Sequence, residues 1–285
     1  MTIAIVGAGA VGCWMAGSLA AAGEDVTLVA RGEALTALKE RGIRKDGVDI
    51  PVATATHASE VDASAIVLAV KATGQSVAGM VAGTTAPLVM TQNSVEAPRM
   101  ISAVVGEERL VPGVVRGYFH HVGPAEVETH GGPGSFTMGP GAPALAAALD
   151  ATDVTVIVRD DVLVDVWEKA MFVECCGALG LLGGADLGAL RTTYRDSFTD
   201  FITEVRNVGI GAGVPIPGDA VERTLAFADA MPATSTTSMQ RDRMAGISGE
   251  FDAQVGAIVR EGDRNGVPVP LHRLAYSLIS GRQEH

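Results

Sequence analysis

Three glycines near the start of this 285-residue chain have a spacing that could bind phosphate groups. They stand in the run Gly7-Ala8-Gly9-Ala10-Val11-Gly12, which follows the pattern G-x-G-x-x-G between an apolar strand and a helix. In dinucleotide-binding turns the first glycine makes the tight turn and the second lets the backbone approach the pyrophosphate. The third lets the helix pack closely on the strand. We therefore expect the whole run, with Ala8, Ala10 and Val11, to bind a nicotinamide dinucleotide.

Arg31 directly follows the second apolar run, Asp25–Ala30. The residue at this position distinguishes NAD from NADP in dinucleotide-binding folds. Proteins that bind NAD usually place Asp or Glu there, to accept a hydrogen bond from the ribose 2′-hydroxyl. A guanidinium can instead pair with a 2′-phosphate through two hydrogen bonds. The sequence therefore predicts NADPH as the cofactor.

Lys71 and Asn93 follow two further apolar runs, Ala65–Val70 and Leu88–Met90. Ligands of doubly wound sheets bind beyond the carboxyl ends of the strands. We expect both side chains to line the cleft for cofactor and substrate.

Lys169 lies beside Trp167 in a long apolar segment that reads as a helix. An amine is costly to bury unless it is paired or functional, and desolvation would lower its pKa toward values useful for acid catalysis. Hydride transfer to a carbonyl needs such a proton donor. His120 and His121 are less suited, because they lie far from the end of any predicted parallel strand.

The predicted elements that position these residues alternate between strand and helix up to about residue 115. The strands are expected at residues 2–6, 25–30, 64–70, 87–91 and 109–115. This alternation predicts an open, mostly parallel sheet with helices on both faces. Antiparallel strands should extend the sheet over residues 118–143, with a hairpin turn at Gly131–Gly134.

From Val162 onward almost every segment reads as helix. We therefore predict an α/β chain with two domains: a Rossmann-type, dinucleotide-binding domain at 1–160, and an all-helical domain for substrate and catalysis at 161–285.

The composition excludes several classes of protein. A formal net charge of −12 and a pI near 4.9 disfavour nucleic acid and anionic membrane surfaces as partners. The three cysteines, Cys13, Cys175 and Cys176, have no spacing typical of disulfides or metal ligands, so we predict no metal site. The N-terminal apolar run is broken by glycines and lacks a signal-peptide pattern, and no segment has a clean transmembrane length. A cytoplasmic protein is expected.

The order of these motifs resembles that of the ketopantoate reductases (2-dehydropantoate 2-reductases). The matching residues are the glycine run, Arg31, Val70-Lys71-Ala72, Gln92-Asn93, Trp167-Glu168-Lys169, Ser238-Met239, and Glu250 twelve residues after Ser238. The resemblance spans nearly the whole chain, and the joint spacing of Lys169, Ser238 and Glu250 is its most specific part.

The resemblance implies an NADPH-dependent reduction of a branched 2-oxo acid to a 2-hydroxy acid, a step of pantothenate biosynthesis. It implies that Lys169 is the general acid and that Glu250 orients the substrate hydroxyl or Lys169. Ser238 would help to bind the substrate carboxylate, and Lys71 and Asn93 would line the cleft.

Three positions depart from the pattern of the best-known family members. Those members carry asparagines four and eight residues after the catalytic lysine, on the same face of the helix. This chain has Val173 and Gly177 there, and Ser94 where a glycine usually follows the asparagine. The resemblance then implies a substrate pocket with a wall that is more apolar and more open.

Three other functions remain compatible with the sequence. The same machinery could reduce a different ketone, oxo acid or imine. The chain could be a non-catalytic NADPH sensor, although such a sensor needs no buried acid. It could also be a dehydrogenase with a similar helical domain that favours oxidation. The apolar helical half allows a homodimer but does not require one.

Overall fold

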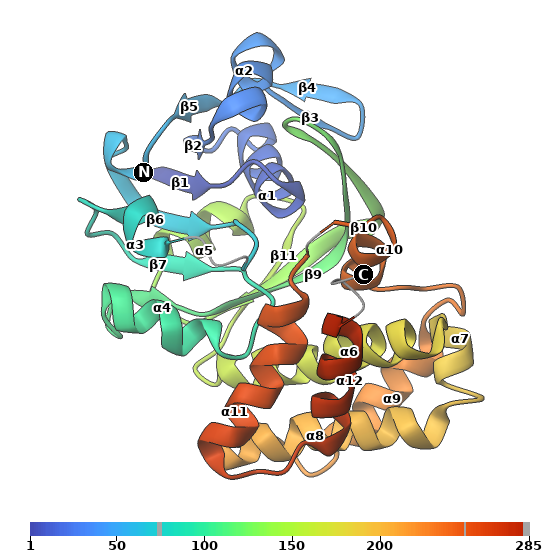
Figure 1. Cartoon of the computed structure of the whole chain (residues 1–285). Coiled ribbons are helices and arrows are strands. Elements are labelled where there is room, and N and C mark those ends of the chain that lie inside the picture. Colours follow the sequence, from blue (N-terminus) through green and yellow to red (C-terminus); the bar gives the residue numbers. More distant parts are fainter. Residues whose placement is uncertain (73–75, 248, 282–285) are drawn as a thin grey trace. The chain divides into compact units, whose positions relative to one another are not determined.

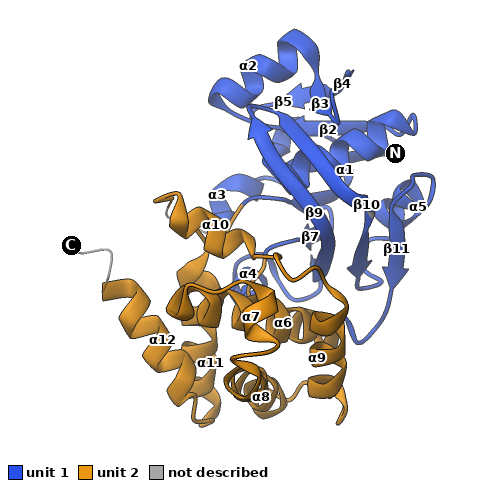
Figure 2. Cartoon of the chain, turned by 90° about the vertical axis from the view of Figure 1, so that its right-hand side faces the viewer, with its two compact units in different colours: residues 1–70, 74–92, 97–162 blue, residues 71–73, 93–96, 163–285 orange. Residues whose placement is uncertain are grey.

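The computed structural model describes residues 1–72, 76–247 and 249–281, and these residues form two compact units (Figure 2). Unit 1 comprises residues 1–70, 74–92 and 97–162. Unit 2 comprises residues 163–285 together with two short segments, 71–73 and 93–96. The units therefore do not divide the chain at one residue, because two short loops of the first half belong with the helices of the second.

Unit 1 is built on a six-stranded sheet in which every neighbouring pair is parallel (Figure 1). In spatial order its strands are β5 (Ala53–Ala55), β2 (Val26–Val29), β1 (Thr2–Val6), β6 (Ala63–Leu68), β7 (Leu88–Met90) and β8 (Leu110–Val111). Counted within this sheet, the order is 3-2-1-4-5-6, the doubly wound arrangement of dinucleotide-binding folds. The predicted fold class, α/β with a Rossmann-type sheet and a helical second part, is confirmed.

Each face of this sheet is buried, since residues alternate between two cores along each strand. On β1, Ile3 and Ile5 pack into one core, and Ala4 and Val6 pack into the other. The first core includes α1 (Ala10–Ala21) and α5 (Pro143–Asp150), and the second includes parts of α3 (Val77–Val81) and α4 (Ala97–Val105). The helix α2 (Gly32–Arg41) follows β2.

The antiparallel strands predicted after residue 115 form a second sheet, which packs against α1. The expectation that they extend the parallel sheet is therefore wrong, because none of them pairs with a strand of that sheet among the described residues. The long strands of the second sheet are β9 (Gly113–Gly123) and β10 (Glu126–Met138), with β3 (Ile43–Lys45), β4 (Val48–Ile50) and β11 (Thr155–Val158) completing it. Trp14 of α1 stacks on Phe119 of β9, with ring centroids 4.3 Å apart. The stack joins α1 to the inner face of the second sheet.

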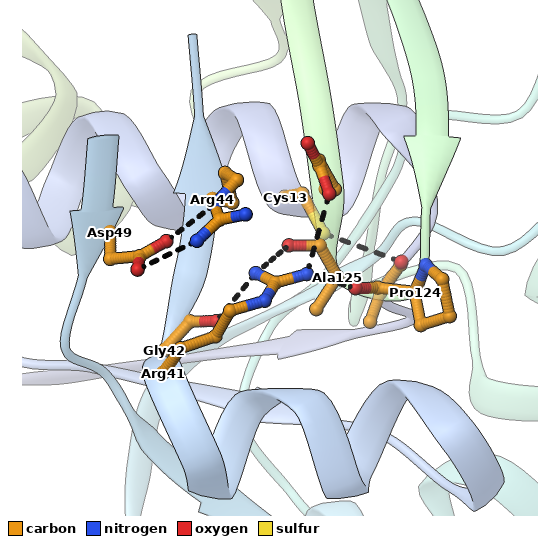
Figure 3. Close-up of polar contacts among 9 residues, drawn as sticks. Cys13, Arg41, Gly42, Arg44, Asp49, Pro124 and Ala125 are labelled. Atoms are coloured by element: carbon orange, nitrogen blue, oxygen red, sulfur yellow. Dashed lines mark hydrogen bonds and ion pairs between the residues drawn. The ribbon is translucent and has the colours of Figure 1, made fainter. Parts of the chain in front are cut away.

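The hairpin turn lies at Pro124–Ala125, so the expected turn at Gly131–Gly134 is wrong. Those glycines lie within β10, where the pairing register shifts between His130 and Ser135, and their positive φ angles fit a bulge. Arg41 at the end of α2 fixes the true turn by donating from Nη2 to the Pro124 carbonyl at 2.7 Å (Figure 3).

Unit 2 is made of helices. They are α6 (Val162–Gly183), α7 (Leu187–Leu190), α8 (Arg195–Gly211), α9 (Ala220–Ala230), α10 (Ser238–Met244), a π-helical turn (Asp252–Gly256), α11 (Ala257–Asn265) and α12 (Pro270–Gly281). A capping box, in which Thr237 and Gln240 bond each other's backbone N–H groups, starts α10. Within the described residues, no helix combines the length and apolar character needed to cross a bilayer.

Candidate active site

The glycine run forms a tight turn between β1 and α1, as its spacing predicts. Gly7 has a φ of +113°, which side chains with a Cβ rarely adopt. A Cβ on Gly12 would lie 1.8 Å from the Gly7 carbonyl oxygen, so only glycine lets α1 start this close to the strand. A Cβ on Gly9, in contrast, would meet no atom within 4 Å.

The start of α1 leaves its backbone donors open to a ligand. Gly9 is the N-cap of the helix, and no side chain caps it. The first N–H groups of a helix lack partners within the helix, and its dipole favours a negative charge at that end. The turn therefore fits the pyrophosphate of a dinucleotide, with Ala10, Val11 and Gly12 supplying N–H groups.

Arg31 lies beyond the carboxyl end of β2, the strand next to β1. It is the N-cap of α2, is exposed, and points its Nε toward the Thr56 carbonyl at 3.5 Å. Because β1 and β2 are parallel, Arg31 and the glycine turn lie at the same edge of the sheet. That position suits a guanidinium that binds the adenosine end of a dinucleotide.

Lys169 and Asn93, 76 residues apart in the chain, form a hydrogen bond in unit 2. The Lys169 ammonium donates to Asn93 Oδ1, and both side chains are half-buried. Lys169 lies on α6, and Asn93 follows the end of β7 by three residues. This hydrogen bond gives the amine on the mostly apolar helix a polar partner.

Glu250 is buried and accepts a hydrogen bond from the backbone N–H of Ala72, 2.8 Å from its Oε1. Burial raises the pKa of Glu250 above its ordinary value. The Ala72 hydrogen bond and the charges of Lys71 and Lys169 oppose this shift, and the charge of Asp242 adds to it. Glu250 therefore lies within the electrostatic influence of both lysines.

Lys71 donates from Nζ to Asp242 Oδ2 at 2.7 Å. Asp242, which lies on α10 one turn after Ser238, is not among the site residues predicted from the sequence. No local signal distinguishes it, since a charged residue on a short helix is usually solvated. Ser238 itself is the exposed first residue of α10.

The space expected at Gly177 is filled by a neighbouring helix. A Cβ on Gly177 would lie 1.9 Å from the Met239 methyl carbon, and one on Gly180 would lie 2.2 Å from Gln240 Nε2. The two glycines let α10 pack tightly on α6. The space beside Gly177 is therefore closed by Met239, whereas a more open space was expected, and Val173 is half-buried.

A second group of charges, also missed by the sequence analysis, adjoins the segment after Asn93. Arg260 of α11 donates to both carboxylate oxygens of the buried Glu96, at 2.6 and 3.1 Å. Glu174 of α6 is fully buried, and its Oε2 has no hydrogen-bond partner among the described residues. Burial raises the pKa of Glu174 well above its ordinary value, with the charge of Glu96 adding to this and that of Lys169 opposing it. A glutamate within the apolar run 170–182 was the available signal.

The cysteines of α6 are structural. Cys175 Sγ lies 4.0 Å from His272 Nε2, and His272 Nδ1 lies 2.7 Å from Glu204 Oε2, in the order of a catalytic triad. However, both Cys175 and His272 have no exposed surface. Burial raises the pKa of the Cys175 thiol well above its ordinary value, which disfavours a thiolate, and the thiol has no exposed surface that a substrate could reach.

Known proteins that are similar to this chain in sequence and in structure include ketopantoate reductases. An annotated 2-dehydropantoate 2-reductase of Mycobacterium tuberculosis is 25% identical, over 99% of this chain and 98% of its own. A PanE/ApbA family ketopantoate reductase from Ralstonia eutropha is 30% identical in its crystal structure, with a TM-score of 0.88 and full coverage of both chains. D-mandelate dehydrogenase, solved with NADH and anilino(oxo)acetate, shares the fold at 21% identity, with a TM-score of 0.86 over 100% of this chain and 99% of its own.

The family descriptions cover both parts of the chain. Residues 3–143 match the ketopantoate reductase PanE/ApbA family, and residues 161–283 match its C-terminal domain. The chain therefore belongs to the ketopantoate reductase PanE/ApbA family.

Proposed function

We propose that this chain is an NADPH-dependent reductase of 2-oxo acids, with 2-dehydropantoate as its default substrate and Lys169 as the general acid. The observation that carries the proposal is the hydrogen bond from Lys169 to Asn93, with Glu250 and Lys71 in the same unit. Residues 1–160 would bind the cofactor, and residues 161–285, together with Lys71 and Asn93 of the first half, would supply the groups that act on the substrate.

The glycine turn and Arg31 fit the cofactor, because the turn offers uncapped N–H groups and Arg31 offers a cation at the same sheet edge. The bound nicotinamide would supply a hydride to the carbonyl carbon of the substrate. Lys169 would then give a proton from Nζ to the carbonyl oxygen, which becomes the hydroxyl of the product. Asn93 Oδ1 would orient the ammonium, and Glu250 would favour its protonated form.

Lys71 and Ser238 would bind the substrate carboxylate. An ammonium and a hydroxyl are suitable donors for that group, and Asp242 holds the Lys71 ammonium in one position. Because this ion pair is half-exposed, it would orient the Lys71 ammonium and contribute little to the free energy of unfolding.

The test of the acid compares Lys169→Ala with Lys39→Ala, an exposed lysine of α2. We expect Lys169→Ala to lower kcat for 2-dehydropantoate by about 10²–10⁴-fold, the usual contribution of a general acid, with NADPH affinity unchanged. Lys39→Ala should behave as the parent chain. Turnover that survives in Lys169→Ala would reject this acid. Tight NADPH binding without turnover of any carbonyl would instead support a sensor.

The test of the cofactor is Arg31→Ala, assayed with NADPH and with NADH. The variant should raise KM for NADPH at least tenfold and leave that for NADH within about twofold, since only NADPH carries the 2′-phosphate. Equal effects on both cofactors would remove the basis for NADPH.

A second candidate substrate is a bulkier and less polar 2-oxo acid. Val173 and Met239 favour it, because they place apolar groups where asparagines of known members would bond a hydroxylated substrate. The related D-mandelate dehydrogenase, solved with an aromatic oxo compound, makes aryl 2-oxo acids the first analogues to test. Faster turnover of an aryl 2-oxo acid than of 2-dehydropantoate would select this candidate.

A further inference from the structure

The outer face of the β9–β10 hairpin in unit 1 brings together two histidines and a glutamate. One ligand atom of each of His120, Glu128 and His130 lies within 4.8 Å of the other two, and all three side chains are exposed. Although the sequence predicts no metal site, we propose that these residues form a binding site for a divalent transition-metal ion of the Zn²⁺ class.

The ladder of the hairpin produces this cluster. His120 of β9 pairs directly with Glu128 of β10, and His130 lies two residues farther along β10. Residues two apart on a strand share one face, and directly paired residues have Cβ atoms about 5 Å apart. The three side chains therefore leave the same face of one rigid element.

The opposite face and the ends of the hairpin are held in place. Phe119 stacks on Trp14, and Val127 is fully buried. Next to Glu128, the backbone N–H and the hydroxyl of Thr129 donate to the two carboxylate oxygens of Asp46, at 2.6 and 2.8 Å. Little backbone freedom would be lost when a metal ion binds, which favours affinity.

Neighbouring carboxylates are already engaged. Asp46 bonds Thr129, and Glu126 forms an ion pair with Arg41 at 3.5 Å beside the turn shown in Figure 3. Glu128 instead lies 3.7 Å from His130, oxygen Oε2 to nitrogen Nε2. The carboxylate of Glu128 is therefore directed to the imidazole with which it would share the ion.

The distances and the donor types fit zinc. Ligand atoms about 2.0–2.2 Å from a tetrahedral Zn²⁺ ion lie roughly 3.4 Å from one another, so rotations of exposed side chains would complete the site. Two imidazoles and one carboxylate are a known three-ligand set for Zn²⁺, and they suit Mg²⁺ or Ca²⁺ poorly. A bound ion would link β9 to β10 across the ladder and keep a position for water.

The experiment titrates Zn²⁺ into the full chain, prepared without a histidine tag and treated with a chelator, by calorimetry. One ion per chain is expected, and Mg²⁺ in excess should not compete. His120→Ala and His130→Ala should each weaken binding at least tenfold. His121→Ala, which removes the neighbouring histidine of β9, should change affinity less than twofold.

Two outcomes would overturn the proposal: no measurable binding, or binding that His120→Ala and His130→Ala leave unchanged. Circular dichroism and Tm without metal should be the same for all variants, because the altered side chains are exposed. X-ray absorption supplies an independent readout. A shell of nitrogen and oxygen ligands is expected, whereas sulfur ligands would assign the ion to the cysteines and refute this site.

Discussion

Alanine at Gly9 and alanine at Gly12 should separate the two roles of the glycine turn. A Cβ on Gly12 would lie 1.8 Å from the Gly7 carbonyl oxygen, and both groups are backbone atoms of a tight turn. A Cβ on Gly9 would meet nothing within 4 Å, and the backbone of Gly9 is extended, with φ −81° and ψ −172°. Gly12→Ala should therefore damage the fold, whereas Gly9→Ala should damage only dinucleotide binding.

The magnitudes follow from the contacts. An added methyl group in a packed site costs about 1–3 kcal/mol, and Gly12→Ala belongs at the upper end because the backbone must open by more than 1 Å. Gly9→Ala restricts the unfolded chain, which stabilises the fold by about 0.4–1 kcal/mol. Alanine is also a poorer N-cap than glycine by a similar amount, so the net change in the free energy of unfolding should be near zero.

The assay combines urea denaturation without ligand and NADPH titration by fluorescence. Gly9→Ala should keep the denaturation midpoint of the parent chain and lose at least about tenfold in NADPH affinity, or 1.4 kcal/mol, because its methyl group occupies the space through which the pyrophosphate approaches. A Gly9→Ala chain that binds NADPH like the parent would refute the assignment of the turn. A Gly12→Ala chain of unchanged stability would refute the packing argument.

Three further variants test unit 2. Glu204→Gln should lower the free energy of unfolding by about 2 kcal/mol at pH 7, because the carboxylate accepts three hydrogen bonds at the start of α12, one of them from the His272 ring. Burial would raise the pKa of Glu204, but these hydrogen bonds and the His272 charge hold that pKa below the ordinary 4.5. The stabilisation by the Glu204 carboxylate is therefore present above pH 4.5 and fades as the pH falls through the lowered pKa. A difference in urea midpoint between variant and parent that is equal at pH 7 and pH 3 would contradict this pH dependence. Arg260→Ala should cost about 3 kcal/mol, since it leaves the buried Glu96 carboxylate without its cation, and Arg260→Lys should recover only part of this in the same assay. Met239→Ala should raise kcat/KM for bulky 2-oxo acids relative to 2-dehydropantoate, and an unchanged ratio would show that Met239 does not limit the substrate.

Four strands of the parallel sheet, β1, β2, β6 and β7, could be read from the sequence because their signals are local. The strand β5 was not predicted, and the expected strand 109–115 is divided between β8 and β9, which belong to different sheets. The apolar run Thr2–Val6 became β1 with the expected bounds, and the β2, β6 and β7 runs were displaced by no more than two residues at either end. The hairpin turn was misplaced, because glycines at 131–134 carry the same local signal in a bulge as in a turn. The pairing of β9 with β10 places these glycines in a bulge and not in the hairpin turn.

The site was also predictable in part. Gly7 and Gly12 could be assigned individual roles, because a backbone that needs positive φ or close approach of its own atoms admits only glycine. The role of Gly9 toward the pyrophosphate stays a prediction. Lys169 stood out as a charge in an apolar helix. Asp242 was missed, since nothing within a few residues distinguishes a paired carboxylate from a solvated one. Glu174 was missed although its place in the apolar run 170–182 was a local signal of burial.

The sequence by itself therefore determined the strand–turn–helix that begins the chain, the helical second half, and the family. These depend on periodicity and backbone sterics over a few residues. Only the tertiary structure brought Asn93 to Lys169, closed the space at Gly177 with Met239, and set His120 across from Glu128. Such contacts join residues from 8 to 76 positions apart, and they follow from strand register and helix packing, which no local pattern encodes.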